Sequence, residues 1–307
     1  MFNNEAHKID YYENGNIRYE KYYMNDQLHN ENGPAKIYYY ENSLIKSKWY
    51  CIDGKLHRED GPAVICYYEN GNKYYEEYRI NEKLYREDGP AVIYYYENGN
   101  KYCEEYYINN NFHNENGPAE IYYYKNGNKQ HEEYRINDKL HNENGPAIIK
   151  YHKNGLIGRK EYYINGKFHR EDGPAVIYYC ENGNIYNKKY YINGKFHRED
   201  GPAVTYYYEN GIIQYEKYYY NDKLHRENKP AIIRYYKDGS IECKEYYING
   251  KFIMTNEEVE KYINSTKPIR IKDINKLKIL YNICKARNLE NKAEEIIDIL
   301  LLETLQK

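Results

Sequence analysis

The chain repeats one motif of residues with a fixed period of 28. A proline followed by alanine anchors each copy, and these prolines are eight of the nine in the chain. They are Pro34, Pro62, Pro90, Pro118, Pro146, Pro174, Pro202 and Pro230. A fixed period of this length indicates a repeat architecture, in which each unit packs on its neighbours. We therefore expect an array rather than a single core, and a scaffold or binding surface rather than a catalyst.

Each unit reads as a β-hairpin. Residues 91–96 and 101–108 are rich in Tyr, Ile and Val, and they flank the sequence Glu-Asn-Gly-Asn. An Asn-Gly pair between two such runs is a strong hairpin signal. Glycine recurs at this turn except at Ser43, which predicts a backbone position with positive φ. A second turn of the type Asn193-Gly194 follows, and after it comes a residue that is always Leu or Phe.

The alternation of residues along the strands separates two faces. In the first strand the slots held by Ala63, Ile65 and Tyr67 barely change between units, whereas the slot of Val64 becomes Glu120 in another unit. Side chains two residues apart share a face of a strand. We predict that the uniform slots form the interior and that the variable slots face solvent or a partner.

Tyrosine dominates the aromatic residues, with 46 Tyr against 5 Phe and one Trp. A cross-strand aromatic ladder is the role we expect for most of these rings. Stacking on sugars or on single-stranded bases, or placement at a membrane interface, are the alternatives. The tyrosines at variable positions are the candidate partner contacts, namely Tyr40, Tyr68, Tyr96, Tyr124 and Tyr208.

Charge and cysteine usage narrow the class of protein. The net charge is −2 with Lys and Glu interleaved, so no basic stripe predicts nucleic-acid binding. No apolar run reaches the length of a membrane span, and residues 1–10 lack the apolar core of a secretory signal. The six cysteines share no metal-type spacing, and five of them stand where sister units have Tyr. We expect free thiols and a cytoplasmic location.

A histidine recurs in the loop before most of the Pro-Ala anchors, from His29 to His225. Two strands per unit would place successive His about 9–10 Å apart, whereas zinc needs nitrogens about 2.0–2.1 Å from the metal. Packing or loop hydrogen bonding is therefore favoured over a metal site. The neighbouring Glu recurs without the spacing of a calcium loop. Arg58 with Asp60, and Asn30 with Asn32, predict side chains that touch in pairs.

No residue stands in a catalytic context. Serine is rare, and residues that recur in every unit cannot supply a unique catalytic set. The Asn-Gly-Asn turns lack the strand-to-helix setting of a phosphate loop. We therefore predict no catalytic residues, no cofactor-binding residues and no metal ligands.

The C-terminal segment differs in kind. Thr255 and Glu258 form a capping box that predicts a helix to about Asn264, which Lys267-Pro268 ends. Apolar spacing predicts a second helix near residues 273–287 and a third over about 290–305. The predicted domains are a repeat array of eight to nine units over 1–254 and a three-helix segment over 255–307. Leu301 and Leu302 are candidate partner contacts, with simple capping of the array as the alternative.

The run from Tyr162 to Lys195, YYINGKFHREDGPAVIYYCENGNIYNKKYYINGK, resembles MORN repeats, especially their divergent variant. The shared pattern is Tyr-x-x-Asn-Gly-Lys, an apolar residue and His, then Gly, a β-run, Asn-Gly and a second Tyr-x-x-Asn-Gly-Lys. Similar arrays occur in large DNA viruses with AT-rich genomes and in some bacteria, which would place a viral copy in the host-cell cytoplasm. The resemblance implies a β-hairpin array that acts as a scaffold or adaptor.

These observations predict a mainly β protein, an elongated antiparallel β-hairpin repeat array with a small α-helical C-terminal cap. The function expected is a non-enzymatic repeat scaffold that mediates protein-protein interaction or assembly. A glycan- or lipid-binding module that uses the Tyr-rich face is the alternative. We expect a protein partner or self-association through the C-terminal helices and the variable strand face. Nucleic acid is not expected, and no feature of the sequence supports membrane association.

Overall fold

The computed structural model is mainly β, with 42% of residues in strands and 12% in helices. It confirms the predicted fold class, because antiparallel hairpins repeat along the chain and three helices follow them. The structure describes residues 5–265 and 271–305. The chain divides into two compact units, Met1–Gly166 (unit 1) and Lys167–Lys307 (unit 2).

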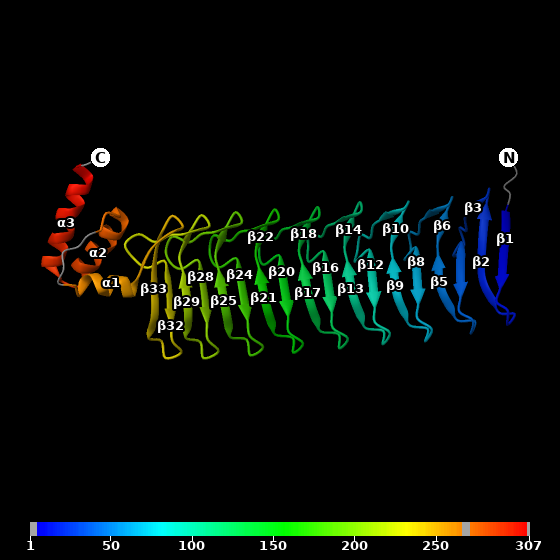
Figure 1. Ribbon diagram of the computed structural model, residues 1–307. Coiled ribbons are helices and arrows are strands. Elements are labelled where there is room, and N and C mark those ends of the chain that lie inside the picture. Colours follow the sequence, from blue (N-terminus) through cyan, green and yellow to red (C-terminus); the bar gives the residue numbers. More distant parts are fainter. Residues whose placement is uncertain (1–4, 266–270, 306–307) are drawn as a thin grey trace. The chain divides into compact units, whose positions relative to one another are not determined.

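In unit 1 each hairpin pairs with the next along the chain, so its long strands form one antiparallel sheet (Figure 1). These strands are β1 (Glu5–Tyr11), β2 (Ile17–Met24), β4 (Lys36–Tyr39), β5 (Ile45–Trp49), β8 (Val64–Tyr67), β9 (Lys73–Glu77), β12 (Val92–Tyr95), β13 (Lys101–Glu105), β16 (Glu120–Tyr123), β17 (Lys129–Glu133), β20 (Ile148–Tyr151) and β21 (Ile157–Glu161). Two-residue strands separate the hairpins: β3 (Gln27–Leu28), β6 (Cys51–Ile52), β7 (Lys55–Leu56), β10 (Arg79–Ile80), β11 (Lys83–Leu84), β14 (Tyr107–Ile108), β15 (Asn111–Phe112), β18 (Arg135–Ile136), β19 (Lys139–Leu140) and β22 (Tyr163–Ile164).

The predicted Asn-Gly turn joins the two strands of each hairpin through a three-residue loop. In the β12–β13 hairpin the Tyr96 N–H donates to the Asn100 carbonyl (2.8 Å), and the Gly99 N–H donates to the Tyr96 carbonyl (2.9 Å). Gly99 has a φ of 87°, which fits a type I turn closed by a left-handed residue. Ser43 adopts the same conformation, with a φ of 67°, so the single exception to glycine keeps the turn.

The second predicted turn is a two-residue loop with two left-handed residues. Asn193 and Gly194 have φ values of 51° and 83°, and Asn137 and Asp138 have 48° and 65°. Two successive positive φ values define the type I′ turn, whose twist matches that of a β-hairpin. The short hairpin that it closes carries the recurrent Leu or Phe, such as Leu140.

Side chains of one unit bond to the backbone of the next. The Asn98 and Asn100 side-chain amides both donate to the Lys125 carbonyl, at 3.1 and 2.8 Å. The Tyr96 hydroxyl donates to the Tyr123 carbonyl at 2.9 Å. Equivalent bonds recur along unit 1. These bonds explain why Tyr and Asn repeat, since each unit is held by its neighbour.

The exposed fractions of the side chains confirm that the uniform slots form the interior, but they correct the prediction that the variable slots are exposed. The recurrent alanines, such as Ala63 and Ala91, are fully buried. The next slot was predicted to face solvent or a partner, yet Val64 and Val92 are only 1% and 3% exposed. Their cross-strand neighbours are long side chains: Val92 lies between Glu77 and Glu105. The stems of such neighbours cover a small apolar residue, so this slot is buried on the second face as well.

Unit 2 continues the same hairpin pattern and ends in helices. Its strands are β23 (Lys167–Phe168), β24 (Val176–Tyr179), β25 (Ile185–Lys189), β26 (Tyr191–Ile192), β27 (Lys195–Phe196), β28 (Val204–Tyr207), β29 (Ile213–Lys217), β30 (Tyr219–Tyr220), β31 (Lys223–Leu224), β32 (Ile232–Tyr235), β33 (Ile241–Ile248) and β34 (Lys251–Thr255). The helices are α1 (Asn256–Ile263), α2 (Ile274–Ala286) and α3 (Glu290–Leu305). All three predicted helices are confirmed within one or two residues, whereas Lys267-Pro268 lies outside the described residues.

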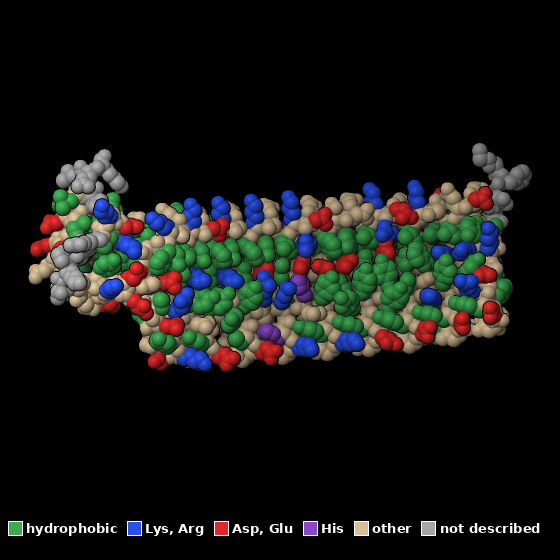
Figure 2. Space-filling model, in the orientation of Figure 1, with side chains coloured by type: hydrophobic (Ala, Val, Ile, Leu, Met, Phe, Trp, Pro, Cys, Tyr) green, Lys and Arg blue, Asp and Glu red, His purple; other side chains and the backbone are tan. Residues whose placement is uncertain are grey.

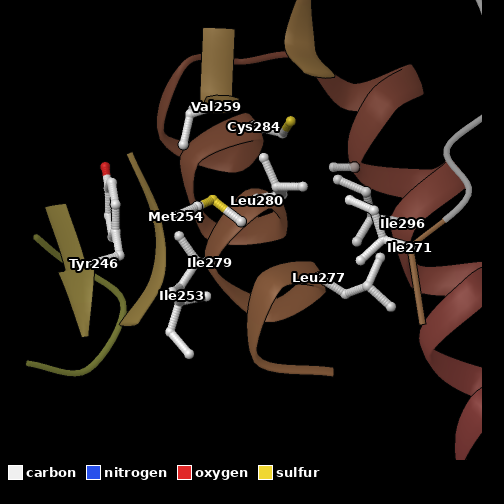
Figure 3. Close-up of a cluster of buried hydrophobic side chains, with 11 residues drawn as sticks. Tyr246, Ile253, Met254, Val259, Ile271, Leu277, Ile279, Leu280, Cys284 and Ile296 are labelled. Carbon is white, nitrogen blue, oxygen red and sulfur yellow. The ribbon is translucent and has the colours of Figure 1, made fainter. Parts of the chain in front are cut away.

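The helices share one hydrophobic core with the last two strands. Ile253 and Met254 of β34 are in contact with a cluster that includes Leu277 and Leu280 of α2 and Ile296 of α3 (Figure 3). The predicted capping box of α1 is present, because the Thr255 side chain accepts from the Glu258 N–H and the Glu258 side chain accepts in return. The predicted boundary at residue 254 therefore falls inside a continuous core, where strand and helix residues pack together.

Candidate functional site

The five candidate tyrosines all have structural hydrogen bonds. Each hydroxyl donates to the backbone carbonyl 27 residues further on, at 2.7–2.9 Å. These residues are Tyr40, Tyr68, Tyr96, Tyr124 and Tyr208, and each is half-buried. Their first role is thus to hold consecutive units together, and a partner contact by the same rings stays a prediction.

The candidate leucines lie on α3. Leu301 and Leu302 are 57% and 61% exposed, whereas Ala293 and Ile296 of the same helix are buried in the core of unit 2. The helix therefore covers the core with one side and leaves two large apolar side chains accessible. A partner contact through them stays a prediction.

The recurrent histidines act in the loops, as predicted. The Asn165 N–H donates to Nδ1 of His141 at 3.2 Å, and Nε2 of the same ring lies 3.5 Å from the Glu143 carboxylate. His57 and His169 have the equivalent two neighbours in their own units, an Asn N–H at Nδ1 and a Glu carboxylate near Nε2. The histidine thus fixes the left-handed turn residue 24 positions further on, while the recurrent Glu faces its other nitrogen. This arrangement explains why His and Glu repeat together.

The paired loop residues are confirmed in part. Arg58, Arg170 and Arg198 each donate from Nε to the Asp two residues on, at 2.8 Å. That hydrogen bond lowers the pKa of Asp60 below its usual value. The Asn pairs differ from the prediction, because the Asn30 side chain accepts from the backbone N–H of Asn32 rather than from its side chain. An Asx turn therefore replaces the expected side-chain contact.

The unit with Glu120 places an acidic residue at an otherwise apolar or basic slot, which lies on the variable face of unit 1. We use this name for the sheet face that carries Val92, Tyr94, Cys103 and Glu105, which are cross-strand neighbours. At the slot of Val92, five sister units have Val64, Ile148, Val176, Val204 and Ile232, and an early unit has Lys36, whereas the unit that follows Val92 has Glu120. Glu120 lies directly opposite Glu105 on one side and Glu133 on the other. Three carboxylates in register are destabilising unless something compensates for them.

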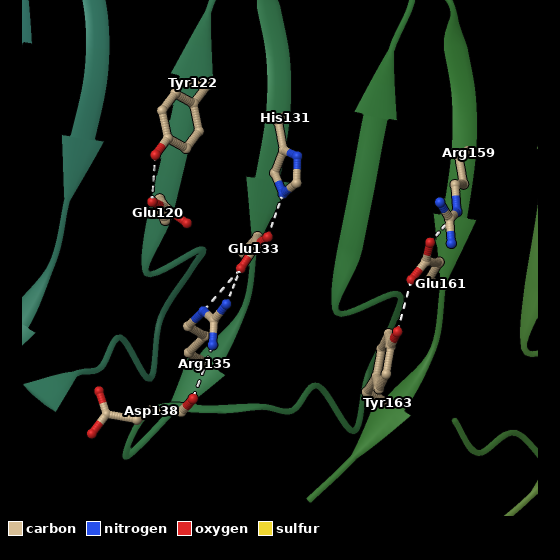
Figure 4. Close-up of polar contacts among 9 residues, drawn as sticks. All are labelled: Glu120, Tyr122, His131, Glu133, Arg135, Asp138, Arg159, Glu161 and Tyr163. Carbon is tan, nitrogen blue, oxygen red and sulfur yellow. Dashed lines mark hydrogen bonds and ion pairs between the residues drawn. The ribbon is translucent and has the colours of Figure 1, made fainter. Parts of the chain in front are cut away.

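Glu133 has cationic partners within the chain. It contacts Nε2 of His131 at 2.7 Å and Nε of Arg135 at 2.9 Å (Figure 4). Burial alone would raise the pKa of the Glu133 carboxyl, but the His131 hydrogen bond and the Arg135 charge outweigh burial and hold this pKa below its usual value. Glu161 also has a cationic partner, Arg159, and it accepts a hydrogen bond from the Tyr163 hydroxyl at 2.9 Å.

Glu105 and Glu120 have tyrosine partners instead. The Tyr107 hydroxyl donates to Glu105 (3.1 Å), and the Tyr122 hydroxyl donates to Glu120 (2.8 Å). No Lys, Arg or His within the described ranges forms an ion pair with either carboxylate. Burial, together with the nearby Glu120 charge, raises the pKa of Glu105.

The opposite face shows how the fold compensates a buried carboxylate. Glu76, which is 4% exposed, accepts from the Lys73 ammonium at 2.6 Å and from the Tyr95 hydroxyl at 2.5 Å. Lys101 and Lys129 bond to Glu104 and Glu132 in the same way. A Lys is thus supplied to each of these glutamates by its own strand, whereas Glu105 and Glu120 have no Lys partner in the part of the chain that the structure describes.

Cys103 lies beside these two carboxylates. Its Sγ is 4.0 Å from the Glu105 carboxylate, and in the described part of the chain Cys103, Glu105 and Glu120 are the metal-ligand types grouped within 4.8 Å. Burial, followed by the Glu105 charge, raises the pKa of the thiol. A protonated thiol is a poor nucleophile. The absence of metal ligands stays a prediction. All six cysteines are free thiols, as expected.

Tyrosine rings surround the carboxylates. Tyr102 lies 5.6 Å from Tyr122 and 5.2 Å from Tyr96, and Tyr75 lies 5.0 Å from Tyr94, between ring centroids. On the face shown in Figure 2, hydrophobic side chains form bands across the strands of unit 1, with charged side chains between them. Tyr102 is 40% exposed. The variable face therefore combines accessible rings with carboxylates that lack cationic partners.

We expect Glu120→Val to stabilise the protein. Valine is the residue of four sister units, and its introduction removes two like-charge contacts, each worth about 0.2–1 kcal/mol. Urea unfolding at one protein concentration should therefore give a gain of roughly 1 kcal/mol at pH 7. Glu97→Val, in an exposed turn, is the control and should give no gain.

The same variant has a predicted pH dependence. Because the folded-state pKa of Glu105 is raised, the wild type binds more protons folded than unfolded and loses stability as pH rises through that window. The advantage of Glu120→Val should shrink as pH falls from 7 toward the ordinary Glu pKa. An advantage that grows on acidification would contradict this account of the carboxylate row.

No family model matches this chain, and a search of curated proteins finds no similar sequence. Among the described residues, no helix has the length and apolar character needed to span a membrane.

Proposed function

We propose that this protein is a non-enzymatic scaffold that mediates protein-protein interaction or assembly through the variable face of unit 1. The observation that supports this proposal is that recurrent and non-recurrent positions of the repeat have different roles. The recurrent Tyr, Asn and His side chains bond to the next unit. The departures from the repeat bring exposed rings and unpaired carboxylates together on one face. A scaffold or adaptor role is also what the resemblance to MORN repeats implies.

A cytoplasmic location belongs to the same proposal. The six free thiols support a reducing compartment. The absence of a catalytic role stays a prediction, which rests on the redundancy of residues that recur in every unit.

Affinity purification of the full chain from its native cells tests the scaffold, with a Tyr74→Gln/Tyr102→Gln variant as the comparison. Both tyrosines are 40% exposed, and sister units have Gln130 and Gln214 at this slot, so the variant should fold. Exposed aromatic rings are frequent anchors of protein interfaces. We expect protein partners with the wild type and at least about a tenfold loss with the variant.

A glycan array and liposome flotation with the same two proteins test the alternative. Binding of a glycan or of vesicles that the Tyr→Gln changes abolish, without any protein partner, would replace the scaffold by a glycan- or lipid-binding module. If the wild type and the Tyr→Gln variant recovered partners equally well, the scaffold would not bind them through the variable face.

A further inference from the structure

The variable face of unit 1 carries a row of ten residues in direct cross-strand register, one from each long strand between β1 and β17. In strand order these are Lys8, Lys21, Lys36, Trp49, Val64, Glu77, Val92, Glu105, Glu120 and Glu133. Three lysines thus stand at one end of these ten positions and three glutamates at the other. Beyond them the row continues in unit 1 with Ile148 and Glu161. If a second copy of these ten positions lies on the first in the opposite strand order, each lysine faces a glutamate.

Five of the six charges have no ion-pair partner among the described residues, whereas Glu133 is already bonded to His131 and Arg135. Within the part of the chain that the structure describes, Lys8, Lys21 and Lys36 form no ion pair with a carboxylate; instead, the Lys21 ammonium lies 4.3 Å from the Tyr19 ring and that of Lys36 lies 4.6 Å from the Tyr38 ring. Among the described residues, Glu105 is bonded to Tyr107 and to the Cys103 thiol, and Glu120 is bonded to Tyr122. One end of the face needs anions and the other needs cations.

The next row on the same face shows complementarity of size. From β2 to β16 it consists, in strand order, of Tyr19, Tyr38, Ser47, Cys66, Tyr75, Tyr94, Cys103 and Tyr122. Reversed on itself, this row places Tyr38 opposite Cys103, Tyr94 opposite Ser47 and Tyr75 opposite Cys66. A large ring then lies over a small side chain at three of the four pairs, with Tyr19 opposite Tyr122 as the fourth. Because Cys103, Cys66 and Ser47 are only 1%, 8% and 7% exposed, the rings around them make the contact.

We propose that a second copy of this chain docks on the variable face of unit 1, with a two-fold axis that runs parallel to the strands between β8 and β9. This rotation brings Lys36 opposite Glu105, Lys21 opposite Glu120 and Lys8 opposite Glu133 of the other copy. The other in-plane two-fold axis, along the row, would place lysine on lysine. The contact is isologous, since each copy offers the same patch to the other. This inference rests on the proposed function, because it identifies the protein partner of the scaffold as a second copy of the chain.

The face is large enough for a stable dimer. Ten strands at about 4.8 Å and about five residues at 3.3 Å cover on the order of 800 Å² per copy. Stable interfaces bury roughly 800 Å² per partner. Complementary charges at both ends fix the register of the two faces, and the rings between them supply the apolar contact.

Charge reversal tests the proposal with residues that the chain already uses at these slots. The acidic-end variant is Glu105→Lys/Glu120→Lys, and it introduces the residue that Lys21 and Lys36 show at the equivalent slots. The basic-end variant is Lys21→Glu/Lys36→Glu, and it introduces the residue that Glu105 and Glu120 show there. Sedimentation velocity of the full chain should give a dimer of the 37.3 kDa protomer for the wild type. Each variant should weaken dimerisation by at least about tenfold, because like charges then face each other.

Mixing the two variants gives the decisive result. The reversed ends of one variant are complementary to those of the other, so an equimolar mixture should recover the dimer as a heterodimer. High salt should weaken both the native and the mixed dimer. Circular dichroism of each variant confirms that it is folded.

Three outcomes would overturn the proposal: a monomeric wild type at tens of micromolar, variants that remain dimeric, or a mixture that stays monomeric although both variants are folded. A dimer that survives charge reversal but is lost in Leu302→Lys would assign self-association to α3 instead. Partner capture by a monomeric wild type would leave the scaffold standing and remove only the second copy. If neither a dimer nor a captured partner were found, both the scaffold function and the second copy as its partner would be rejected.

Discussion

Leu280→Ala is expected to lower the free energy of unfolding of unit 2 by about 2–5 kcal/mol, the usual cost of a leucine-sized cavity in a packed core. Leu280 is 1% exposed and belongs to the cluster that joins α2 to Met254 of β34 and Ile296 of α3. Because both strands and helices contribute to this core, its loss should loosen the three helices together. The recurrent units pack only on their neighbours, so the effect should stay near this end of the sequence.

Two spectroscopic signals separate the regions of the chain. The single tryptophan, Trp49, lies in β5 of unit 1, so its fluorescence follows that unit, whereas ellipticity at 222 nm is dominated by the helices of unit 2. In urea, Leu280→Ala should shift the helical transition to lower concentration and leave the Trp49 transition in place. Leu302→Ala, at a side chain that is 61% exposed, is the matched control and should change little. Equal shifts of both signals would mean that the array unfolds as one cooperative body.

The repeat made the local structure predictable. Turn residues, the capping box of α1 and the Arg–Asp pairs depend on residues close in sequence, and the structure confirms each of these three features. The tether from Tyr96 to the Tyr123 carbonyl spans 27 residues. Such a bond needs the position of the neighbouring unit, so sequence periodicity alone predicted the tyrosine slot but not its bond.

The burial of the second face was predicted wrongly for a definite reason. Variation between units was equated with exposure, yet Val64 is buried between Trp49 and Glu77 because these neighbours are long. In a row of cross-strand neighbours, the size of the flanking side chains decides whether a small one is covered. That information lies in the register of the strands rather than in the alternation along one strand.

The candidate site was visible in part. Alignment of the units shows Glu120 at a slot that is mostly valine or isoleucine, a signal that the sequence alone presents only as variation between units. That Glu120 stands between Glu105 and Glu133, and that three lysines occupy the other end of the same row, requires the register of all ten strands. The charge pattern therefore became evident only with the sheet.

Ala63→Leu is expected to destabilise unit 1 by about 1–3 kcal/mol, the usual cost of forcing extra methyl groups into a filled space. Ala63 is fully buried, and its carbonyl accepts from the Tyr50 N–H at 2.8 Å. The Arg58 guanidinium lies 3.9 Å from the centre of the Tyr50 ring and reaches the Pro62 carbonyl, so the loop passes directly over this position. A leucine would have to displace the loop or open the strand pair.

Trp49 lies beside this position, on the strand that pairs with β8, and reports the change directly. Its fluorescence transition in urea should move to lower concentration in Ala63→Leu, while the helical signal of unit 2 stays unchanged. Ala6→Leu, at an exposed alanine of β1, controls for the added hydrophobic surface and should be close to neutral. If Ala63→Leu were as stable as the wild type, the recurrent alanine could not be attributed to close packing of loop on sheet. The repeat would then need another reason for keeping its smallest side chain at every anchor.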